Sequence, residues 1–227
     1  PRNHTKHSGL NGHWLETQMG LKINNQLAPD ILGFEMKKDS VKITFGDWGP
    51  DFKLFQDGTF FPELSKKMKR IKFFQMFGKP NIIKNNRLSY TRPKINQILD
   101  GKIMTMNDHH INIIYNYDVD NRQNKSELIP PKYRRVLILE QWTIETMSKR
   151  IKSKFNQNGW FQCLYDEHHC FSEIQFHKPF DVEIFSRLVQ QGVIYQDGVP
   201  YMTNNRWYSQ WRIHKTCIHQ LYEETKH

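Results

Sequence analysis

Cysteine is scarce in this sequence, with only three such residues in a chain of 227. The number is odd, which does not suit a domain held together by paired disulfides. Cys163 and Cys170 are also seven positions apart, unlike the close pairs of structural zinc sites. A disulfide-rich secreted scaffold is therefore disfavoured, and the cysteine count fits a reducing compartment.

Long apolar runs are absent too. No run approaches the ~20 residues that a helix needs to cross a bilayer, and no signal peptide opens the chain. We therefore expect no membrane-spanning helix. Because the first residue is Pro1 rather than Met, we expect a processed protein or a fragment of a longer one.

Acidic residues are outnumbered. The chain has 23 Asp and Glu against 33 Lys and Arg, a formal net charge of +10 and a pI near 9.5. This balance favours a polyanionic partner, with nucleic acid preferred to an anionic membrane surface. Although only 37% of residues are apolar, 13% are aromatic, which is too many for a disordered polymer.

The hydrophobic pattern predicts a mixture of strands and helices. Alternation of apolar and polar residues indicates strands over residues 40–45, 109–117 and 133–139. Helical spacing and stop signals indicate helices over residues 10–20, 62–77, 141–156 and 180–191. Residues 51–61 are predicted to form a β-hairpin that turns at Asp57–Gly58.

Two consecutive segments are strongly basic, the predicted helix over 62–77 and the polar stretch 79–102. Their cations would contact a phosphate backbone and add affinity that is independent of sequence. The alternative is an ordinary solvated surface. The residues concerned are Lys66, Lys67, Lys69, Arg70, Lys72, Lys79, Lys84, Arg87, Arg92, Lys94 and Lys102.

The stretch 29–37 combines charges with apolar residues. If residues 34–37 form a strand, Glu35 and Lys37 point to one side while Phe34 and Met36 point into a core. An ion pair at a solvated strand edge would be the simplest explanation of such charges. The surrounding apolar residues argue against it, because charges on a core strand need a reason.

A second carboxylate lies close by in this stretch. Asp30 precedes Gly33, which can bend the backbone and return the Asp30 carboxylate to the side of Glu35. Two such oxygen ligands suit a hard divalent cation such as Mg²⁺, and the amine of Lys37 would hold or activate a water beside it.

The segment 204–215 interleaves amides, cations and aromatic side chains. Arg pairs well with guanine and Asn or Gln with adenine, so the mixture suits contact with base edges. The alternative is a core strand in which Trp207 and Trp211 are buried and the charges lie outside. Both can hold on opposite faces of one strand.

Several elements together resemble restriction endonucleases of the MvaI/BcnI type, and the related mismatch-repair nuclease MutH is similar. The resemblance covers roughly residues 9 to 45 and implies a PD-(D/E)xK core, an α/β fold with a mixed central β-sheet flanked by helices. It rests on the order and spacing of Gly12, Leu15–Glu16, Met19–Leu21, Asn24–Asn25, Pro29–Asp30 and Gly33–Lys37.

The resemblance also implies an activity and its residues. Asp30 and Glu35 would bind one or two Mg²⁺ ions with the Met36 carbonyl, Lys37 would be the catalytic lysine, and Glu16 would approach a second metal position. The expected enzyme is a type II restriction endonuclease that cuts double-stranded DNA. Its expected DNA contacts are Asn205, Arg206, Tyr208, Gln210, Arg212, His214 and Lys215.

We expect a single nuclease domain over 1–227, with a catalytic part at about 9–140 and a DNA-recognition part at about 141–227. A MutH-like strand-nicking enzyme and a catalytically idle nucleic-acid-binding module are the alternatives. Double-stranded DNA is the expected partner, with no membrane partner. Both monomer and homodimer remain open, and the expected location is a prokaryotic cytoplasm, at the nucleoid.

Overall fold

The structure, a computed structural model, describes residues 14, 17–18, 20, 29–168 and 170–223. The expected helix over residues 10–20 falls largely outside them, and Glu16 is not among them. The chain forms two compact units, each built from separate segments of sequence. The first unit comprises residues 1–43, 148–185 and 214–227, and the second comprises residues 44–147 and 186–213.

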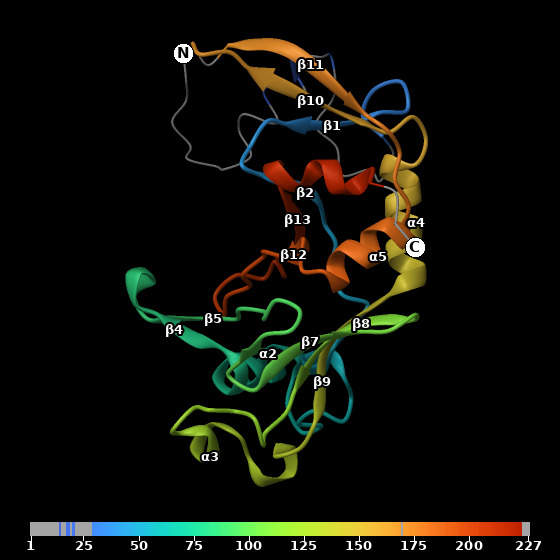
Figure 1. The fold of residues 1–227 in the computed structure, drawn as a ribbon. Coiled ribbons are helices and arrows are strands. Elements are labelled where there is room, and N and C mark those ends of the chain that lie inside the picture. Colours follow the sequence, from blue (N-terminus) through green and yellow to red (C-terminus); the bar gives the residue numbers. More distant parts are fainter. Residues whose placement is uncertain (1–13, 15–16, 19, 21–28, 169, 224–227) are drawn as a thin grey trace. The chain divides into compact units, whose positions relative to one another are not determined.

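A three-stranded sheet organises the first unit. Strand β1 (Glu35–Lys38) pairs in parallel with β10 (Trp160–Tyr165), which pairs antiparallel with β11 (Phe171–His177) (Figure 1). Met36 packs on one face against Phe161 and Cys163, as expected for the apolar side of the strand. The sheet is therefore mixed, and the other face carries the side chains of Glu35 and Lys37.

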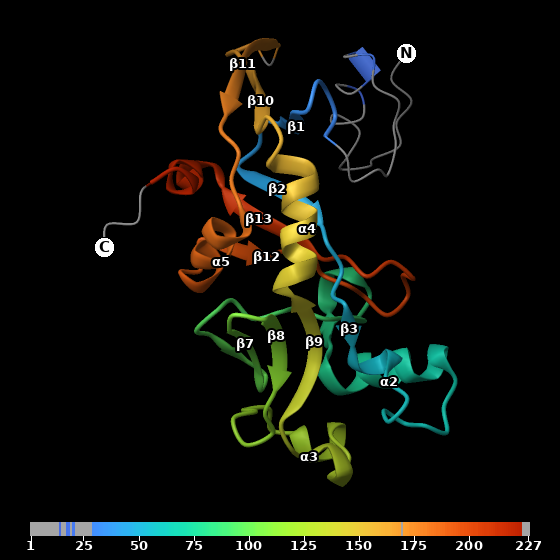
Figure 2. The ribbon, with the colours of Figure 1, turned by 90° about the vertical axis from the view of Figure 1, so that its right-hand side faces the viewer.

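Helices α4 (Ile144–Phe155) and α5 (Val182–Gln190) each have residues in both units. In α4, shown along its length in Figure 2, the buried Met147, Ile151 and Phe155 recur every four residues and form one apolar stripe. Gly192, with a φ of +73°, follows the end of α5. Within the described part of the chain, no helix is long and apolar enough to cross a membrane.

An antiparallel sheet organises the second unit, with the strand order β3-β9-β8-β7-β6. Buried aliphatic residues of β8, Ile111 and Ile113, alternate with more exposed ones, so one face of the strand lies in the core. The strands are β3 (Phe52–Lys53), β6 (Ile98–Leu99), β7 (Lys102–Met106), β8 (His110–Tyr115) and β9 (Leu137–Thr143).

The remaining elements are short, apart from helix α2 (Lys66–Phe77). A small sheet has the order β12-β13-β2, and β4 pairs with β5 in a separate hairpin. The strands are β2 (Lys42–Asp47), β4 (Lys79–Asn81), β5 (Arg87–Ser89), β12 (Ile194–Gln196) and β13 (Gln210–His214). The helices are α2 (Lys66–Phe77), α3 (Lys125–Leu128), and the 3₁₀ turns η1 (Leu54–Gln56), η2 (Ile82–Lys84), η3 (Pro131–Tyr133) and η4 (Lys215–Leu221).

The strand expected over 133–139 begins only at Leu137, and the helix expected over 62–77 begins at Lys66. Two further expected elements also differ from the structure. The hairpin over 51–61 is wrong: Phe52 and Lys53 pair with β9, and the following residues turn so that Phe55 and Phe60 are buried. The helix expected to begin at Gln141 begins at Ile144, because β9 continues through Thr143, which pairs with His110 of β8. In both places tertiary pairing outweighed the local pattern.

Three of the cations expected to contact phosphate are buried instead, so that expectation is wrong for Lys69, Arg92 and Lys102. The Lys69 amine donates to the Asp57 carbonyl at 2.9 Å, and the Lys102 amine donates to the Phe77 carbonyl at 2.9 Å. A buried cation needs such acceptors because its charge has left water.

Arg92 forms a buried ion pair with Glu140 of β9. Its Nε and Nη2 donate to the two carboxylate oxygens at 2.7 and 2.8 Å, and the side chains are 1% and 0% exposed. The Trp207 indole donates to the same carboxylate at 2.5 Å, and Arg92 Nη1 donates to the Tyr208 carbonyl at 3.0 Å. Each carboxylate oxygen of Glu140 thus has a partner.

Candidate active site

A tight turn over residues 31–34 brings the first carboxylate to its place. Ile31 and Phe34 exchange backbone hydrogen bonds at 3.0 and 2.7 Å, and the two residues between them, Leu32 and Gly33, have φ values of +48° and +81°. Positive φ at both central positions is the type I′ geometry of two-residue hairpins. The bend expected at Gly33 is therefore confirmed.

The turn folds Asp30 back onto β1. The Asp30 Oδ2 atom accepts a hydrogen bond from the Met36 backbone N–H at 2.9 Å. Asn158, which precedes β10, holds the turn because its side-chain amide donates to the Leu32 carbonyl at 2.7 Å. The position of Asp30 thus depends on a turn within its own segment and on a residue far along the chain.

Glu35 receives two ammonium groups on one oxygen. Lys37 Nζ lies 2.6 Å and Lys154 Nζ 2.9 Å from Glu35 Oε1. Glu35 itself is 2% exposed, and its other oxygen, Oε2, is buried with no hydrogen-bond partner in the part of the chain that the structure describes. A buried carboxylate oxygen without a donor is available to a water molecule or a metal ion.

The two carboxyl groups are shifted in opposite directions. Burial raises the pKa of Asp30, and the neighbouring Glu35 carboxylate raises it further. Burial also favours a higher pKa for Glu35, but the Lys37 and Lys154 ammonium groups outweigh it and hold that pKa below its ordinary value. Glu35 is therefore firmly ionised, whereas Asp30 has no ion pair with a cation among the residues that the structure describes.

Lys154 was missed by the sequence analysis. It lies in the last turn of α4, next to the buried Phe155, whose ring lies 5.5 Å from Lys37 Nζ. Helical spacing identifies Phe155 as a core residue and so places its neighbour near the core boundary. Glu35 of β1 and Lys154 are 119 positions apart in the sequence. No local pattern therefore shows that this part of α4 contacts β1.

The open side of β1 carries backbone groups as well. The N–H groups of Glu35 and Asp39 donate toward the β10 side, to Gly159 and Cys163, whereas the Met36 N–H donates to Asp30. In a strand the N–H and C=O of one residue point to the same side. The Met36 carbonyl therefore lies on the side of β1 that carries the Asp30 carboxylate.

These donors fit a magnesium ion. Mg²⁺ is usually held by one or two carboxylates and completes its shell with waters and substrate phosphates. Asp30, the unpartnered Glu35 Oε2 and the Met36 carbonyl supply such oxygens. The described residues contain no group of three or more His, Cys, Asp or Glu placed to hold a metal. A site for an ion that prefers nitrogen and sulfur ligands, such as zinc, is therefore not seen among them.

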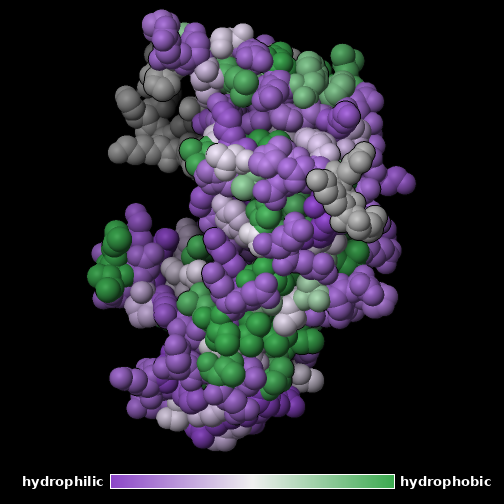
Figure 3. All heavy atoms as spheres, viewed as in Figure 1, coloured by the Kyte–Doolittle hydropathy of each residue, from purple (hydrophilic) through white to green (hydrophobic). Residues whose placement is uncertain are grey.

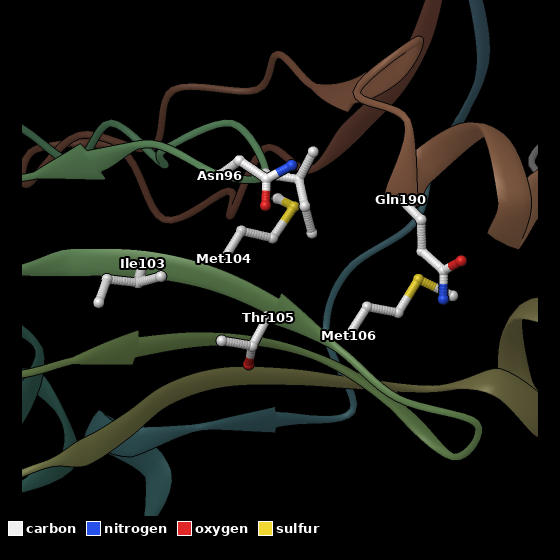
Figure 4. Close-up of a pocket in the computed structure, with 7 residues that line it drawn as sticks. Asn96, Ile103, Met104, Thr105, Met106 and Gln190 are labelled. Atoms are coloured by element: carbon white, nitrogen blue, oxygen red, sulfur yellow. The ribbon is translucent and has the colours of Figure 1, made fainter.

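An open cavity of about 430 Å³ lies elsewhere, in the second unit. Figure 4 shows its lining side chains, with Met106 of β7 beside Gln190 of α5 and Met104 beside Asn96. Its lining residues, Ile95, Asn96, Ile103, Met104, Thr105, Met106 and Gln190, include no titratable side chain. The cavity therefore offers no side chain that acts as a general acid or base.

Most of the expected DNA-contacting residues lie together in the second unit. In β13, Trp211 and Ile213 are fully buried, while Gln210 and Arg212 alternate with them and are partly exposed. A core face and a polar face thus coexist on this strand. Asn205 and Arg206 are exposed in the preceding loop, and Tyr208 lies under the Arg206 guanidinium.

The arginines of this segment are held by acids. Arg206 Nη2 lies 2.6 Å from Asp47 Oδ2, and Arg212 Nη1 lies 2.7 Å from Asp197 Oδ2. Arg212 Nη2 also donates to the Gln210 side chain at 2.6 Å. These contacts fix the directions of the guanidinium groups.

The last two expected contacts belong to the first unit. His214 Nδ1 lies 2.8 Å from the Thr216 hydroxyl, and Lys215 Nζ lies 2.6 Å from Asp39 Oδ1. Lys215 is exposed, so its ammonium group is accessible to solvent. The assignment of these side chains to DNA stays a prediction.

The mixed α/β fold, with Glu35 and Lys37 on β1 and Asp30 turned back onto that strand, is of the PD-(D/E)xK nuclease class. The solved complex of restriction endonuclease MvaI with cognate DNA superposes with a TM-score of 0.63 and 11% identity, over 97% of this chain and 89% of that one. The expected mixed α/β fold is thereby confirmed.

Sequence comparison then gives the family. The family model for the LlaMI restriction endonuclease matches residues 2–225. The type II restriction enzyme ScrFI from Lactococcus lactis subsp. cremoris is 35% identical over 228 residues, which cover 91% of this chain and 84% of that enzyme. The chain belongs to the LlaMI restriction endonuclease family. The expected class of enzyme, a DNA-cleaving restriction endonuclease, is confirmed.

Proposed function

We propose that this restriction endonuclease hydrolyses phosphodiester bonds of double-stranded DNA at the cluster formed by Asp30, Glu35 and Lys37, with Mg²⁺ as the cofactor. One observation carries the assignment. Glu35 is buried and ionised, and two ammonium groups share its Oε1 atom. Its Oε2 atom has no hydrogen-bond partner among the described residues, and a second carboxylate, Asp30, lies nearby. Asp100, a buried acid paired with Lys79, also has an oxygen without a hydrogen-bond partner in the described part of the chain. The open oxygen of Glu35 is therefore informative because Asp30 and Lys37 lie beside it.

The cofactor has a defined donor set in this proposal. Asp30, Glu35 Oε2 and the Met36 carbonyl would hold one or two Mg²⁺ ions, with Glu16 as the expected residue at a second position. When bound, Mg²⁺ polarises the phosphodiester and lowers the pKa of a bound water. Asp30 gains the most from an added cation, because burial and Glu35 already raise its pKa.

Lys37 is the residue that faces the reacting groups. Its ammonium group is fixed by Glu35 at 2.6 Å and lies near the Phe155 ring, so its direction is restricted. From there it orients the attacking water and stabilises the negative charge that develops on the phosphate oxygens. Because the group is preorganised, it needs little rearrangement during the reaction.

Lys154 acts through Glu35 and is a positioning residue. By sharing Oε1 with Lys37, it keeps the Glu35 carboxylate turned so that Oε2 stays free. Together with Lys37, whose effect is larger, it keeps Glu35 ionised despite burial. The expected division into a catalytic part at about 9–140 and a DNA-recognition part at about 141–227 stays a proposal. Lys154 would be an active-site residue that lies in the second of these parts.

Sequence recognition is assigned to the segment before the C-terminal 3₁₀ turn. We assign base or backbone contacts to Asn205, Arg206, Tyr208, Gln210, Arg212, His214 and Lys215. The polar face of β13 and the fixed guanidinium groups support this assignment, since bidentate Arg contacts need a defined direction. Asp47 and Asp197 pair with these arginines. Their carboxylates would also accept a hydrogen bond from the amino group of a neighbouring cytosine.

Digestion of a supercoiled, fully sequenced plasmid tests the proposal. With Mg²⁺ we expect linear products whose ends, mapped by run-off sequencing, share one sequence. Glu35→Gln should remove cleavage but keep binding in Ca²⁺, whereas the exposed Glu173→Gln on the same sheet should cut normally. Full activity of Glu35→Gln would overturn the site assignment.

The same digestion separates the alternatives. Nicked circles as the final product would point to a strand-nicking enzyme, and tight salt-sensitive binding without any cutting would point to an idle binding module. Sedimentation of the complex with DNA distinguishes the monomer from the homodimer. The expected cytoplasmic location at the nucleoid stays a prediction.

A further inference from the structure

The hairpin of β4 and β5 carries an unusual apolar tip. Ile82 and Ile83, adjacent residues in η2, are 85% and 90% exposed. Figure 3 shows the apolar surface at the end of this hairpin, set off from the hydrophilic surface around it. Single exposed apolar residues are common on proteins, but two neighbouring β-branched side chains at the tip of a hairpin form a small ridge.

The chain conformation holds the two isoleucines beyond the ladder. The last pair of the hairpin is Asn81 with Arg87, and the loop closes through Asn85 and Asn86, which have φ values of +52° and +55°. Asn tolerates this left-handed region better than most residues with a side chain. The tip is therefore a defined turn and presents Ile82 and Ile83 at its end.

Strand β5 is fixed along its length to residues 200–202. The Arg87 guanidinium stacks on the Tyr201 ring at 3.7 Å, and the Met202 N–H donates to the Leu88 carbonyl at 2.9 Å. Ser89 also forms a β-bridge with Tyr201. Residues 200–202 lead directly into the segment assigned to DNA recognition, so the tip and that segment share one support within the second unit.

Charge identifies the partner of the tip. Residues 79–91 contain three Lys or Arg, namely Lys79, Lys84 and Arg87, and no Asp or Glu. A stable protein–protein contact buries about 800 Å² on each partner, which is far more than two isoleucine side chains offer. A few apolar side chains among cations are instead the composition of wedges that enter the minor groove of DNA.

We propose that Ile82 and Ile83 insert between base pairs from the minor groove of bound duplex DNA and kink it, while Lys84 and Arg87 contact the flanking phosphates. This inference rests on duplex DNA as the partner and not on the cleavage chemistry. Flexible pyrimidine–purine steps unstack most easily, so the wedge adds sequence preference at base pairs that receive no hydrogen bond.

The test uses the full chain in Ca²⁺ with a duplex of about 30 base pairs that the wild-type protein selects from a random-sequence pool. Energy transfer between dyes at the two ends reports bending, and 2-aminopurine reports unstacking. We expect the wild-type protein to bend the duplex by roughly 20–90°. The double variant Ile82→Ala/Ile83→Ala should lose the bend and bind about tenfold more weakly.

Two controls isolate the wedge. Val136→Ala/Ile138→Ala removes two exposed β-branched residues of the same unit and should bend DNA like the wild type. Lys84→Ala should retain the bend but reduce the slope of log affinity against log salt by about 0.9. Unchanged thermal unfolding of the isoleucine variant excludes misfolding as the cause.

Two results would overturn the wedge. In one, the isoleucine variant bends and binds DNA like the wild type. In the other, it bends DNA normally but loses self-association in sedimentation, which would make the tip a protein contact. A wild-type protein that cuts DNA without bending it disproves the wedge alone, whereas failure of the proposed function appears as absence of cutting in Mg²⁺.

Discussion

Two buried carboxylates in this protein have opposite surroundings. Glu140 in the second unit has a hydrogen-bond donor on each oxygen, from Arg92 and Trp207. Glu35 in the first unit has two ammonium groups on Oε1, and its buried Oε2 has no hydrogen-bond donor among the described residues. Both are almost fully buried, so burial does not distinguish them. What differs is whether any oxygen remains open.

Under the proposed function, this difference separates a structural group from a catalytic one. A closed pair such as Arg92–Glu140 holds β9 to the segments around residues 198 and 208, and neither charge is available to a ligand. At Glu35 the cluster is arranged around a position that the described residues do not fill. We call Arg92–Glu140 the closed pair, and Asp30, Glu35, Lys37 and Lys154 the open cluster. We infer that removing a charge from the closed pair lowers the free energy of unfolding, whereas removing one from the open cluster lowers the rate of cleavage.

The largest effect is expected for Asp30→Asn. Cleavage in Mg²⁺ should fall about 10⁴-fold, because a metal ligand is lost. Folding should be unaffected or improved: the raised pKa of Asp30 means that its ionised form is less favourable in the folded than in the unfolded chain at neutral pH. Single-turnover cleavage and urea unfolding measure the two quantities. A strongly destabilised variant would contradict the comparison.

Arg92→Met tests the closed pair. It leaves Glu140 charged and buried, so the free energy of unfolding should fall by about 3–5 kcal/mol. The double variant Arg92→Met/Glu140→Gln should regain part of that loss, since the buried charge is gone and an acceptor remains for Trp207. If Arg92→Met unfolds at the wild-type urea concentration, the pair is not the structural element described.

Lys154→Met tests the positioning role in the open cluster. Cleavage should slow about 10–100-fold, the usual effect of losing a residue that orients a metal ligand. The matched control is Lys152→Met, an exposed lysine of the same helix, which should cut normally. Lys154→Arg should restore part of the rate. Equal rates for both methionine variants would remove Lys154 from the active site.

The smallest effect is expected for Arg206→Ala. Its pair with Asp47 is largely exposed, so stability should change by less than about 1 kcal/mol. If Arg206 contacts a phosphate, the slope of log affinity against log salt should decrease by about one. If it contacts a base, discrimination at one position of the target should relax while the slope stays closer to its original value.

The sequence predicted the core of the candidate site because that part is local. Asp30, Gly33, Glu35 and Lys37 lie within eight residues, and the alternation of a strand is enough to put two of them on one face. Gly33 also identified the turn that returns Asp30 to β1. The family resemblance added the roles of these residues, which alternation alone does not assign.

The rest depends on contacts between distant segments. Lys154 and Glu35 are 119 positions apart, and Arg92 and Glu140 are 48 positions apart. Neither ion pair can therefore be recognised from the sequence around one of its residues. Arg92 looked like one cation of a basic surface because composition does not show which cation has a buried acceptor. The segment 51–61 was misassigned for a related reason, since its aromatic residues pack on α2 and on Tyr133 rather than across a hairpin.

Calorimetric titration of Ca²⁺ into the complex of this endonuclease with its selected duplex tests the central claim most directly. Ca²⁺ takes oxygen ligands without supporting cleavage in this proposal, so binding is measured apart from chemistry. The account predicts saturable binding by the wild type and by Arg92→Met at a temperature where that variant is folded, and loss of binding in Asp30→Asn. Equal Ca²⁺ affinity of Asp30→Asn and the wild type would contradict it.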